Sequence, residues 1–399
     1  MSNTLPGGLR QNWPQFMLLV GVNALVGGMV GLERSIVPQL AKTEFGVQSA
    51  SWLLSFIVAF GLSKAVANYA SGVWANRLGR KNLLVAGWLV VLPQPFILFY
   101  APNWTWVIGA NVLLGINQGL TWSSTVGMKL DLAGQKHRGL AAGLNEFAGY
   151  LAVGLAAWYS SHLAEQYGAR PVLVYAGLGL ALAGTLISLL FVKDTGRLVR
   201  QEQQKSTIPM LKHPFWAVTW GHQSLGAISQ AGLVNNLNDG LLWGLLPVLL
   251  SQHLSTSQVG LVAALYPGVW GVSQLATGSL ADRFPVRALL LVGMLVQGVG
   301  LLALITVRSA TSFGLLTSLI GLGTALVYPT FLVAIAQHTN PVQRATCLGT
   351  FRLWRDFGYV VGALLSGFLA DRWGVPTAIV TVGILTGVSG LVAYIRLDR

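Results

Sequence analysis

Residues 193–213 read KDTGRLVRQEQQKSTIPMLKH, the longest polar stretch in a chain of 399 residues. The sequence on either side is strongly apolar. Overall, 53% of the residues are hydrophobic and only 9% are charged, whereas a soluble domain carries about 25% charged residues. This composition excludes an ordinary soluble enzyme. It predicts a polytopic membrane protein that is divided near its middle by one polar linker.

The apolar sequence divides into segments of membrane-spanning length. A helix needs about 20 apolar residues to cross the hydrocarbon core. Twelve segments meet this requirement, six on each side of the linker: 14–38, 52–74, 83–100, 105–128, 139–161, 171–192, 224–250, 258–280, 288–307, 311–336, 345–369 and 376–395. We therefore expect an all-α membrane protein.

Lysine and arginine gather on one side of this arrangement. With the N-terminus placed inside, 17 of them lie on the cytoplasmic side, 4 lie on the opposite side and 4 lie within the spans. Positive charge in short loops marks the cytoplasmic side, so both termini are predicted to be cytoplasmic. The net charge of +13 is then an orientation signal, and we expect no nucleic-acid partner.

The two halves of the sequence repeat each other. With a shift of about 206 residues, SGVWANR at 71–77 falls on TGSLADR at 277–283. With a shift of 209, Gly31 falls on Gly240 and Pro38 falls on Pro247. Two parallel copies of a six-span unit are the plan of one class of secondary transporter.

The repeat and the linker together predict the domain organisation. We expect an N-terminal six-helix bundle over 1–192, a cytoplasmic linker over 193–213 and a C-terminal six-helix bundle over 214–399.

Residues 72–81, GVWANRLGRK, resemble the signature G-x-x-x-D-R-x-G-R-[KR] of the major facilitator superfamily. The resemblance covers the whole chain through span count, topology and repeat. It implies two bundles around a central cavity that open alternately to each side. In that family the acidic residue of the signature helps to latch the cytoplasmic side. Here Asn76 replaces it, while the second-half copy keeps Asp282, and we assign Asn76, Arg77, Arg80 and Asp282 to gating.

The chain departs from the pattern of many proton-driven antiporters of this family at two places. Asn117-Gln118-Gly119 stands where many of them carry an arginine before the glycine, and Phe147-Ala148-Gly149-Tyr150 lacks their Gly-Pro pair. These departures argue against a simple assignment as a drug antiporter.

Eight charged side chains lie within the predicted spans. They are Glu33, Arg34, Lys64, Glu146, Asp239, Arg352, Arg355 and Asp356. A charge at mid-membrane costs at least about 2.5–3.5 kcal/mol, so such residues usually face a cavity and a partner. One interpretation is purely structural pairing. The other is that some pairs break when a substrate or a proton binds.

Asp239 lies about halfway along the span 224–250. Asn235 and Asn238 stand four and one residues before it, a spacing that we interpret as one helix face. We hypothesise that Asp239 is a protonation site or substrate ligand and that the two asparagines are its hydrogen-bonding neighbours. The alternative is a structural pair with a nearby lysine or arginine.

Glu33 and Arg34 are consecutive, so their side chains point about 100° apart. We favour Arg34 as the residue that faces the substrate and Glu33 as the proton carrier or counter-charge. Lys64 sits in the middle of its span and needs a partner, for which Asp239 and Asp356 are candidates by depth. A structural salt bridge is its other interpretation.

Arg352, Arg355 and Asp356 form one stripe of the span 345–369, in which Arg352 and Asp356 can pair. The shift of 206 places Arg352 on Glu146. We hypothesise that Glu146 meets Arg352 or Arg355 across the cytoplasmic mouth and closes it in the outward-open state. Pairing within each half is the alternative.

Three uncharged residues complete the candidate substrate site. Asn117 belongs to a polar face of the fourth span, and Trp122 and Trp243 lie deeper than the tryptophans near span ends. We expect the two tryptophans to pack against a substrate.

These observations predict a proton-coupled secondary transporter, exporter or antiporter, for a small polar or anionic solute. We expect a functional monomer in the plasma membrane of a prokaryote. An uncoupled facilitator or exchanger for an anion is the alternative. The sequence holds no P-loop, no metal-ligand spacing and no catalytic triad, so we expect no cofactor, no metal and no enzymatic activity.

Overall fold

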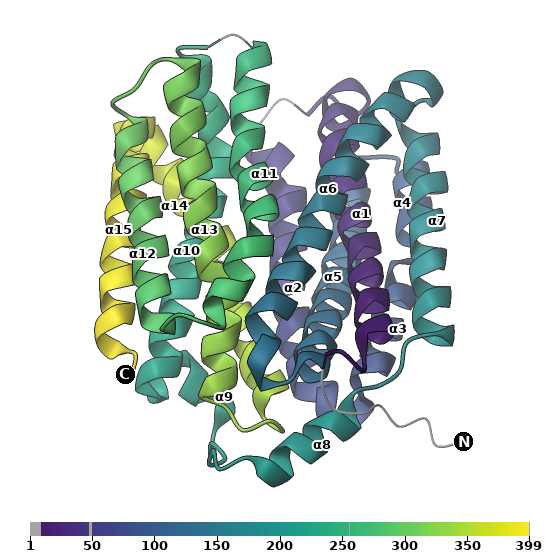
Figure 1. Cartoon of the computed structure of the whole chain (residues 1–399). Helices are drawn as coiled ribbons and strands as arrows, with labels where there is room; N and C mark the ends of the chain where they lie inside the picture. The colour runs from purple at the N-terminus through teal and green to yellow at the C-terminus, as the bar shows by residue number, and fades with distance from the viewer. Residues whose placement is uncertain (1–8, 48–49, 255, 399) are drawn as a thin grey trace. The chain divides into compact units, whose positions relative to one another are not determined.

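The computed structural model describes residues 9–47, 50–254 and 256–398, and within these ranges the chain consists of helices joined by short turns, without a β-strand (Figure 1). Each of the twelve predicted spans coincides with a helix or, for the third span, with a consecutive pair. These helices are α1 (Trp13–Thr43), α2 (Ala50–Leu78), α3 (Arg80–Val91), α4 (Gln94–Tyr100), α5 (Trp104–Ala133), α6 (Arg138–Tyr167), α7 (Ala169–Leu190), α10 (Gln223–Ser251), α11 (Thr256–Ala281), α12 (Val286–Leu304), α13 (Ala310–Gln337), α14 (Arg344–Trp373) and α15 (Val375–Arg396).

Eight of the spans formed by described residues are long and apolar enough to cross a membrane by length and composition. The other four predicted spans correspond to α5, α10, α11 and α14. These four helices carry many of the buried amide, tyrosine and charged side chains of the chain. The predicted all-α membrane fold is confirmed.

The polar linker contains a helix that the sequence pattern did not predict. α8 (Gly196–Lys205) buries Leu198 and Val199 and exposes most of its charged and amide side chains at least in part. A second irregular segment, α9 (Pro214–Trp216) followed by a π-helical turn at Ala217–Gly221, precedes α10.

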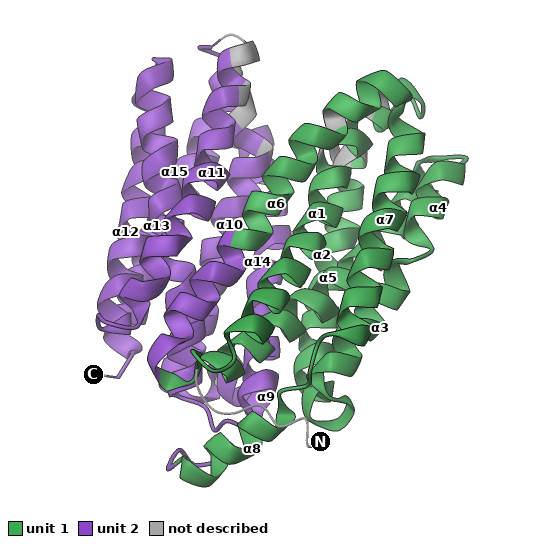
Figure 2. Cartoon of the chain, turned by 45° about the vertical axis from the view of Figure 1, so that its right-hand side comes forward, with its two compact units in different colours: residues 1–135, 148–206 green, residues 136–147, 207–399 purple. Residues whose placement is uncertain are grey.

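The chain forms two compact units (Figure 2). Unit 1 comprises residues 1–135 and 148–206, and unit 2 comprises residues 136–147 and 207–399. The boundary at 206 falls inside the predicted linker. Residues 136–147, which include the first turns of α6, pack with unit 2 although the rest of α6 belongs to unit 1.

Four helix pairs of unit 1 recur in unit 2. In unit 1, α5 packs against α2 and α3, and α7 packs against α1 and α3. In unit 2, α13 packs against α11 and α12, and α15 packs against α10 and α12. If α3 and α4 are counted as one span, these contacts join the same spans in each half, the fourth to the second and third and the sixth to the first and third. The internal repeat of the sequence is therefore also a repeat of packing.

Glycines let the paired helices approach each other closely at equivalent positions. A Cβ atom at Gly31 of α1 would collide with the carbonyl oxygen of Val153 on α6. A Cβ atom at Gly240 of α10 would lie 2.5 Å from the carbonyl oxygen of Tyr359 on α14. Gly31 and Gly240 are related by the shift of 209, and Val153 and Tyr359 by the shift of 206. Such small-residue contacts are how helices associate in lipid.

This contact predicts that Gly240→Ala destabilises the protein. The added methyl group must push α10 and α14 apart, at a cost of about 1–3 kcal/mol. Thermal unfolding of the purified protein in detergent measures the effect as a lower melting temperature. Gly268→Ala is the matched control, because a Cβ atom at Gly268 of α11 meets nothing within 4 Å. Equal melting temperatures for the two variants would contradict the role of the contact.

The start of α10 is held by the C-terminal end of the chain. The Nδ1 atom of His222 accepts a hydrogen bond from the N–H of Leu225 at 3.4 Å. Ser224 donates to the carboxylate of Asp398 at 2.7 Å. The rings of His222 and His338 lie 6.1 Å apart. Burial and the neighbouring His338 lower the pKa of His222 below its usual 6.5, and Asp398 opposes this shift.

Acidification is therefore expected to loosen the first turn of α10. A histidine with a lowered pKa binds more protons in the unfolded chain than in the folded one, so its contribution to stability falls as the pH drops below about 6.5. Protonated His222 also loses the acceptor that caps Leu225. Hydrogen exchange of this turn, corrected for intrinsic rates, should increase between about pH 7.5 and about pH 5.5. His222→Asn keeps a capping acceptor and should abolish the pH response; an unchanged response would contradict the assignment.

Candidate substrate and coupling site

Asp239 is connected to two other helices of unit 2. Its buried carboxylate accepts a hydrogen bond from the hydroxyl of Tyr266 on α11. The same hydroxyl lies 3.3 Å from the hydroxyl of Thr324 on α13. Asp239, Tyr266 and Thr324 therefore form a buried chain of three polar groups that connects α10, α11 and α13.

The asparagines near Asp239 differ in their hydrogen bonds. Asn238 donates to Gln297 of α12 at 2.9 Å and accepts from Thr386 of α15 at 2.6 Å. Its amide is thus used in packing, away from the Tyr266 side. Asn235 is fully buried, and neither its amide nitrogen nor its amide oxygen has a partner among the described residues. The sequence prediction treated the two asparagines alike, whereas the structure assigns them different surroundings.

The arginines of α14 surround one tyrosine. Arg352 donates to the hydroxyl of Tyr328 on α13 at 3.1 Å, and the guanidinium of Arg355 lies 4.2 Å from the centre of the same ring. Asp356 is 3.4 Å from Arg355 and accepts from Asn236 of α10 at 3.4 Å. Asp356 therefore forms an ion pair with Arg355, and the pair of Arg352 with Asp356 stays a prediction.

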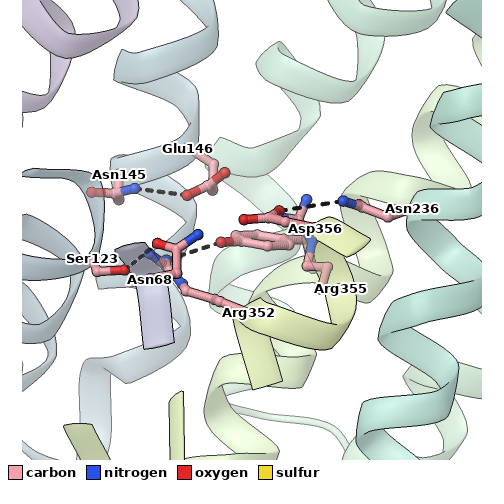
Figure 3. Close-up of polar contacts among 9 residues, drawn as sticks. Asn68, Ser123, Asn145, Glu146, Asn236, Arg352, Arg355 and Asp356 are labelled. Atoms are coloured by element: carbon pink, nitrogen blue, oxygen red, sulfur yellow. Dashed lines mark hydrogen bonds and ion pairs between the residues drawn. The ribbon is translucent and has the colours of Figure 1, made fainter. Parts of the chain in front are cut away.

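Glu146 belongs to the same unit as this cluster. Its buried carboxylate accepts a hydrogen bond from Asn145 at 2.7 Å. Figure 3 shows the side chains of Glu146, Arg352 and Asp356 directed toward one region. These side chains of unit 2 are buried and include both signs of charge.

Asp282 binds the beginning of α6 within unit 2. Its two carboxylate oxygens accept from the backbone N–H groups of Gly139 and Leu140 at 2.7 and 3.0 Å. Gly139 and Gly143 lie against Gly278 of α11 so closely that a side chain would not fit between the backbones. A carboxylate at the first N–H groups of a helix is favourable for its hydrogen bonds and for the helix dipole.

In unit 1, the buried acid Glu33 has amide neighbours. It accepts a hydrogen bond from Gln94 of α4, and Asn111 of α5 is a further neighbour. Its second carboxylate oxygen has no partner among the described residues. Gln94 was not identified from the sequence, although a glutamine between two prolines in an apolar span is a visible signal.

The basic residues of unit 1 lie beside aromatic rings. The Arg34 guanidinium is 5.8 Å from the ring centre of Phe56 and 5.1 Å from that of Phe60. The Lys64 ammonium is 5.8 Å from the Phe60 ring. These distances are within the range of a cation–π interaction.

The uncharged candidates differ in burial. Asn117 donates to the carbonyl of Gly87 at 2.9 Å and joins α5 to α3. Trp122 is buried, with its ring 5.9 Å from that of Tyr150. Trp243 of α10 is 52% exposed.

The signature residues also have different surroundings. Asn76 and Arg77 are exposed, but Arg80 is buried and forms an ion pair with Asp131 of α5 at 2.9 Å. Thr195, just before α8, donates to the same carboxylate at 2.7 Å. Asp131 and Thr195 therefore connect the signature to the linker. Among the described residues, no group of three or more histidine, cysteine or acidic side chains could hold a metal ion.

Comparisons with known proteins agree with this architecture. The model of the Major Facilitator Superfamily matches residues 17–230 and 228–399. A relative named multi-drug resistance efflux pump PmrA homolog, from Lactococcus lactis subsp. lactis (strain IL1403), is 22% identical over 396 residues, covering 97% of this chain and 96% of the relative. Multidrug resistance protein MdtG of Citrobacter koseri is 22% identical over 396 residues, covering 95% of this chain and 94% of the relative.

Two solved structures have the same fold. The human organic anion transporter MFSD10 (TETRAN) superposes with a TM-score of 0.77 at 17% identity, covering 95% of this chain and 99% of that chain. A single-site variant of the E. coli fucose:proton symporter FucP superposes with a TM-score of 0.73 at 13% identity, covering 96% of this chain and 98% of that chain.

Proposed function

Because the chain belongs to the major facilitator superfamily, we propose that it is a proton-coupled secondary transporter that moves a small polar or anionic solute by alternating access. Family membership makes it a membrane transporter of small molecules rather than an enzyme. The bacterial relatives named as a multi-drug resistance efflux pump and a multidrug resistance protein favour the plasma membrane and export. We propose that this export occurs by antiport with protons. Both termini are proposed to be cytoplasmic and the functional unit to be a monomer.

The burial of acidic groups is the observation that supports proton coupling. Asp239 and Glu33 both lie in the apolar interior, and each has a neutral hydrogen-bond donor, Tyr266 or Gln94. An acid in such surroundings can exist as a neutral carboxylic acid, because a neutral group is far cheaper to bury than a charge. Binding and release of a proton at either acid would change the hydrogen bonds between helices.

The polar groups near these acids support a small polar or anionic solute. In unit 2, Arg352 and Arg355 are buried beside Tyr328, and Asn235 offers an unused amide. In unit 1, we propose Arg34, Lys64, Asn117 and Trp122 as contributors to solute binding. We also propose Asn238, which donates to Gln297, and Trp243, which is 52% exposed, as contributors in unit 2.

An uncoupled facilitator or exchanger for an anion is the second candidate. Buried arginines favour it, and one structural neighbour is described as an organic anion transporter. In this candidate the acids have structural roles only. Movement of solute without movement of protons distinguishes it from the first.

The experiment that tests coupling measures proton movement in proteoliposomes that enclose a pH-sensitive dye. A panel of organic anions, zwitterions and lipophilic cations is added to the wild-type protein, Asp239→Asn and Glu33→Gln. We expect a solute-triggered pH change that at least one substitution abolishes, because an amide cannot release a proton.

Asp371→Asn is the control variant, since Asp371 is exposed on α14 and its replacement should leave the pH signal unchanged. Transport of radiolabelled solute without any pH change, in the wild type and both variants, would reject coupling and favour the anion facilitator.

The charged residues outside the coupling acids are proposed to act in gating. Asp282 binds the first N–H groups of α6, and Glu146 lies in the same unit as Arg352, Arg355 and Asp356. We assign to these contacts the closure of one entrance during the cycle. Asn76, Arg77 and Arg80 would act at the corresponding loop of the first half, with Arg80 held by Asp131.

Reversal of the Glu146 charge tests the gating proposal. Glu146→Lys places a cation in a buried region that already contains Arg352 and Arg355. We expect solute exchange to slow about tenfold, equivalent to about 1.4 kcal/mol in the barrier. Glu165→Lys is the matched control on the same helix, because Glu165 is exposed. Equal exchange rates for Glu146→Lys and the wild type would refute a gating role for Glu146.

A further inference from the structure

The third span is broken where it passes Glu33. α3 ends at Val91 and α4 begins at Gln94, with Leu92 and Pro93 between them. Pro93 and Pro95 lack backbone N–H groups, so carbonyls of the preceding turn lose their usual donors. On the other side of the break, Gly177 of α7 leaves room for Pro95, whose Cγ would lie 3.1 Å from an added Cβ. The break is therefore packed on both sides.

The residue that begins the second half of this span holds the acid of unit 1. Gln94 is 2% exposed, and its amide nitrogen donates to the Oε1 atom of Glu33. The Oε2 atom of Glu33 is buried and has no partner among the described residues. Asn111 of α5 is the other polar neighbour. Three buried polar side chains from α1, α4 and α5 thus meet at this point.

The charged groups around this acid are directed elsewhere. Arg34, next to Glu33 on α1 and its electrostatic neighbour, places its guanidinium by the rings of Phe56 and Phe60. The ammonium of Lys64 of α2 lies 5.8 Å from the centre of the Phe60 ring. Among the described residues, no ion pair within 4.0 Å joins Glu33 to a cation. The amide of Gln94 is therefore the direct contact that α4 makes with the carboxyl.

We infer that Gln94 is a positioning residue that holds Glu33 as the proton-binding carboxyl of unit 1 and connects its protonation to the break between α3 and α4. As a neutral acid, Glu33 keeps its bond from Gln94 and has one O–H to donate. As a carboxylate, it requires more donors than one amide supplies. Gaining or losing the proton then favours different positions of Gln94, and hence of the first turn of α4. This inference rests on the proposed proton coupling and adds the site in unit 1 at which the proton binds.

Infrared spectroscopy of the purified protein tests the inference without solute or gradient. Acidification should produce the carbonyl band of a protonated carboxylic acid, and Glu33→Gln should remove one component of that band. In Gln94→Met, which keeps a similar volume but removes the amide, the midpoint of this component should shift by about one pH unit, the equivalent of one hydrogen bond. Gln297→Met is the matched control, because Gln297 is a buried amide of α12 that bonds to Asn238.

A second variant tests the connection to the break. Pro95→Ala restores a backbone N–H at the start of α4 and leaves the Gln94 amide in place, so the Glu33 component should again shift. An identical band in the wild type and Glu33→Gln would overturn the proton site. Equal midpoints for the wild type and Gln94→Met would overturn the positioning role, and no shift in Pro95→Ala would overturn the connection to the break.

The outcome is separable from that of the transport assay. If Glu33 titrates as described but solute moves without a pH change, the proposed proton coupling is wrong, and Glu33 is still a protonation site. If solute moves with protons and the Glu33 component is absent, the proposed function stands and this inference fails.

Discussion

The structure depends on one constraint, which is that polar groups inside an apolar bundle must find partners within the chain. Water is absent from the hydrocarbon core, and an unpaired charge there is costly. The described charges meet this requirement in different ways. Arg355 pairs with an acid, Arg352 with a tyrosine hydroxyl, and Arg34 with aromatic rings. Most of these contacts tie one helix to another, so the same groups that support function also determine how the helices of each unit pack.

Close contact between backbones provides the second part of this packing. The glycines at 31 and 240 place α1 on α6 and α10 on α14 at equivalent points of the repeat. Because both contacts are to carbonyl oxygens, neither can be adjusted by a change of rotamer. The repeat in the sequence is therefore also a repeat in helix packing. Where equivalent positions of the two halves carry different polar residues, the difference points to function more than to architecture.

The fold was predictable from the sequence because span length, span number and internal repeat are properties of composition along the chain. The contacts of individual side chains were not predictable in this way. Asn238 and Asp239 are adjacent, yet one bonds to α12 and α15 and the other to α11. Trp243 lies well inside its span, yet it is 52% exposed, because position along a helix does not determine which side chains are covered. The segment 136–147 joins unit 2 because glycines at its surface fit α11, a contact that no periodicity reveals.

Where the halves differ, their polar residues serve different purposes. Arg80 of the first signature is buried on Asp131, and the shift of 206 places the apolar Val286 at its position in the second copy. Asp282 is retained in the second copy and binds the start of α6, whereas Asn76 in the first copy is exposed. An acid that satisfies helix N–H groups supplies a contact that an amide supplies more weakly. The first copy instead holds its own linker through Asp131 and Thr195. The second-half signature therefore contacts α6, whereas the first-half signature contacts the linker. Equivalent positions of a symmetric fold thus bind two different segments of the chain.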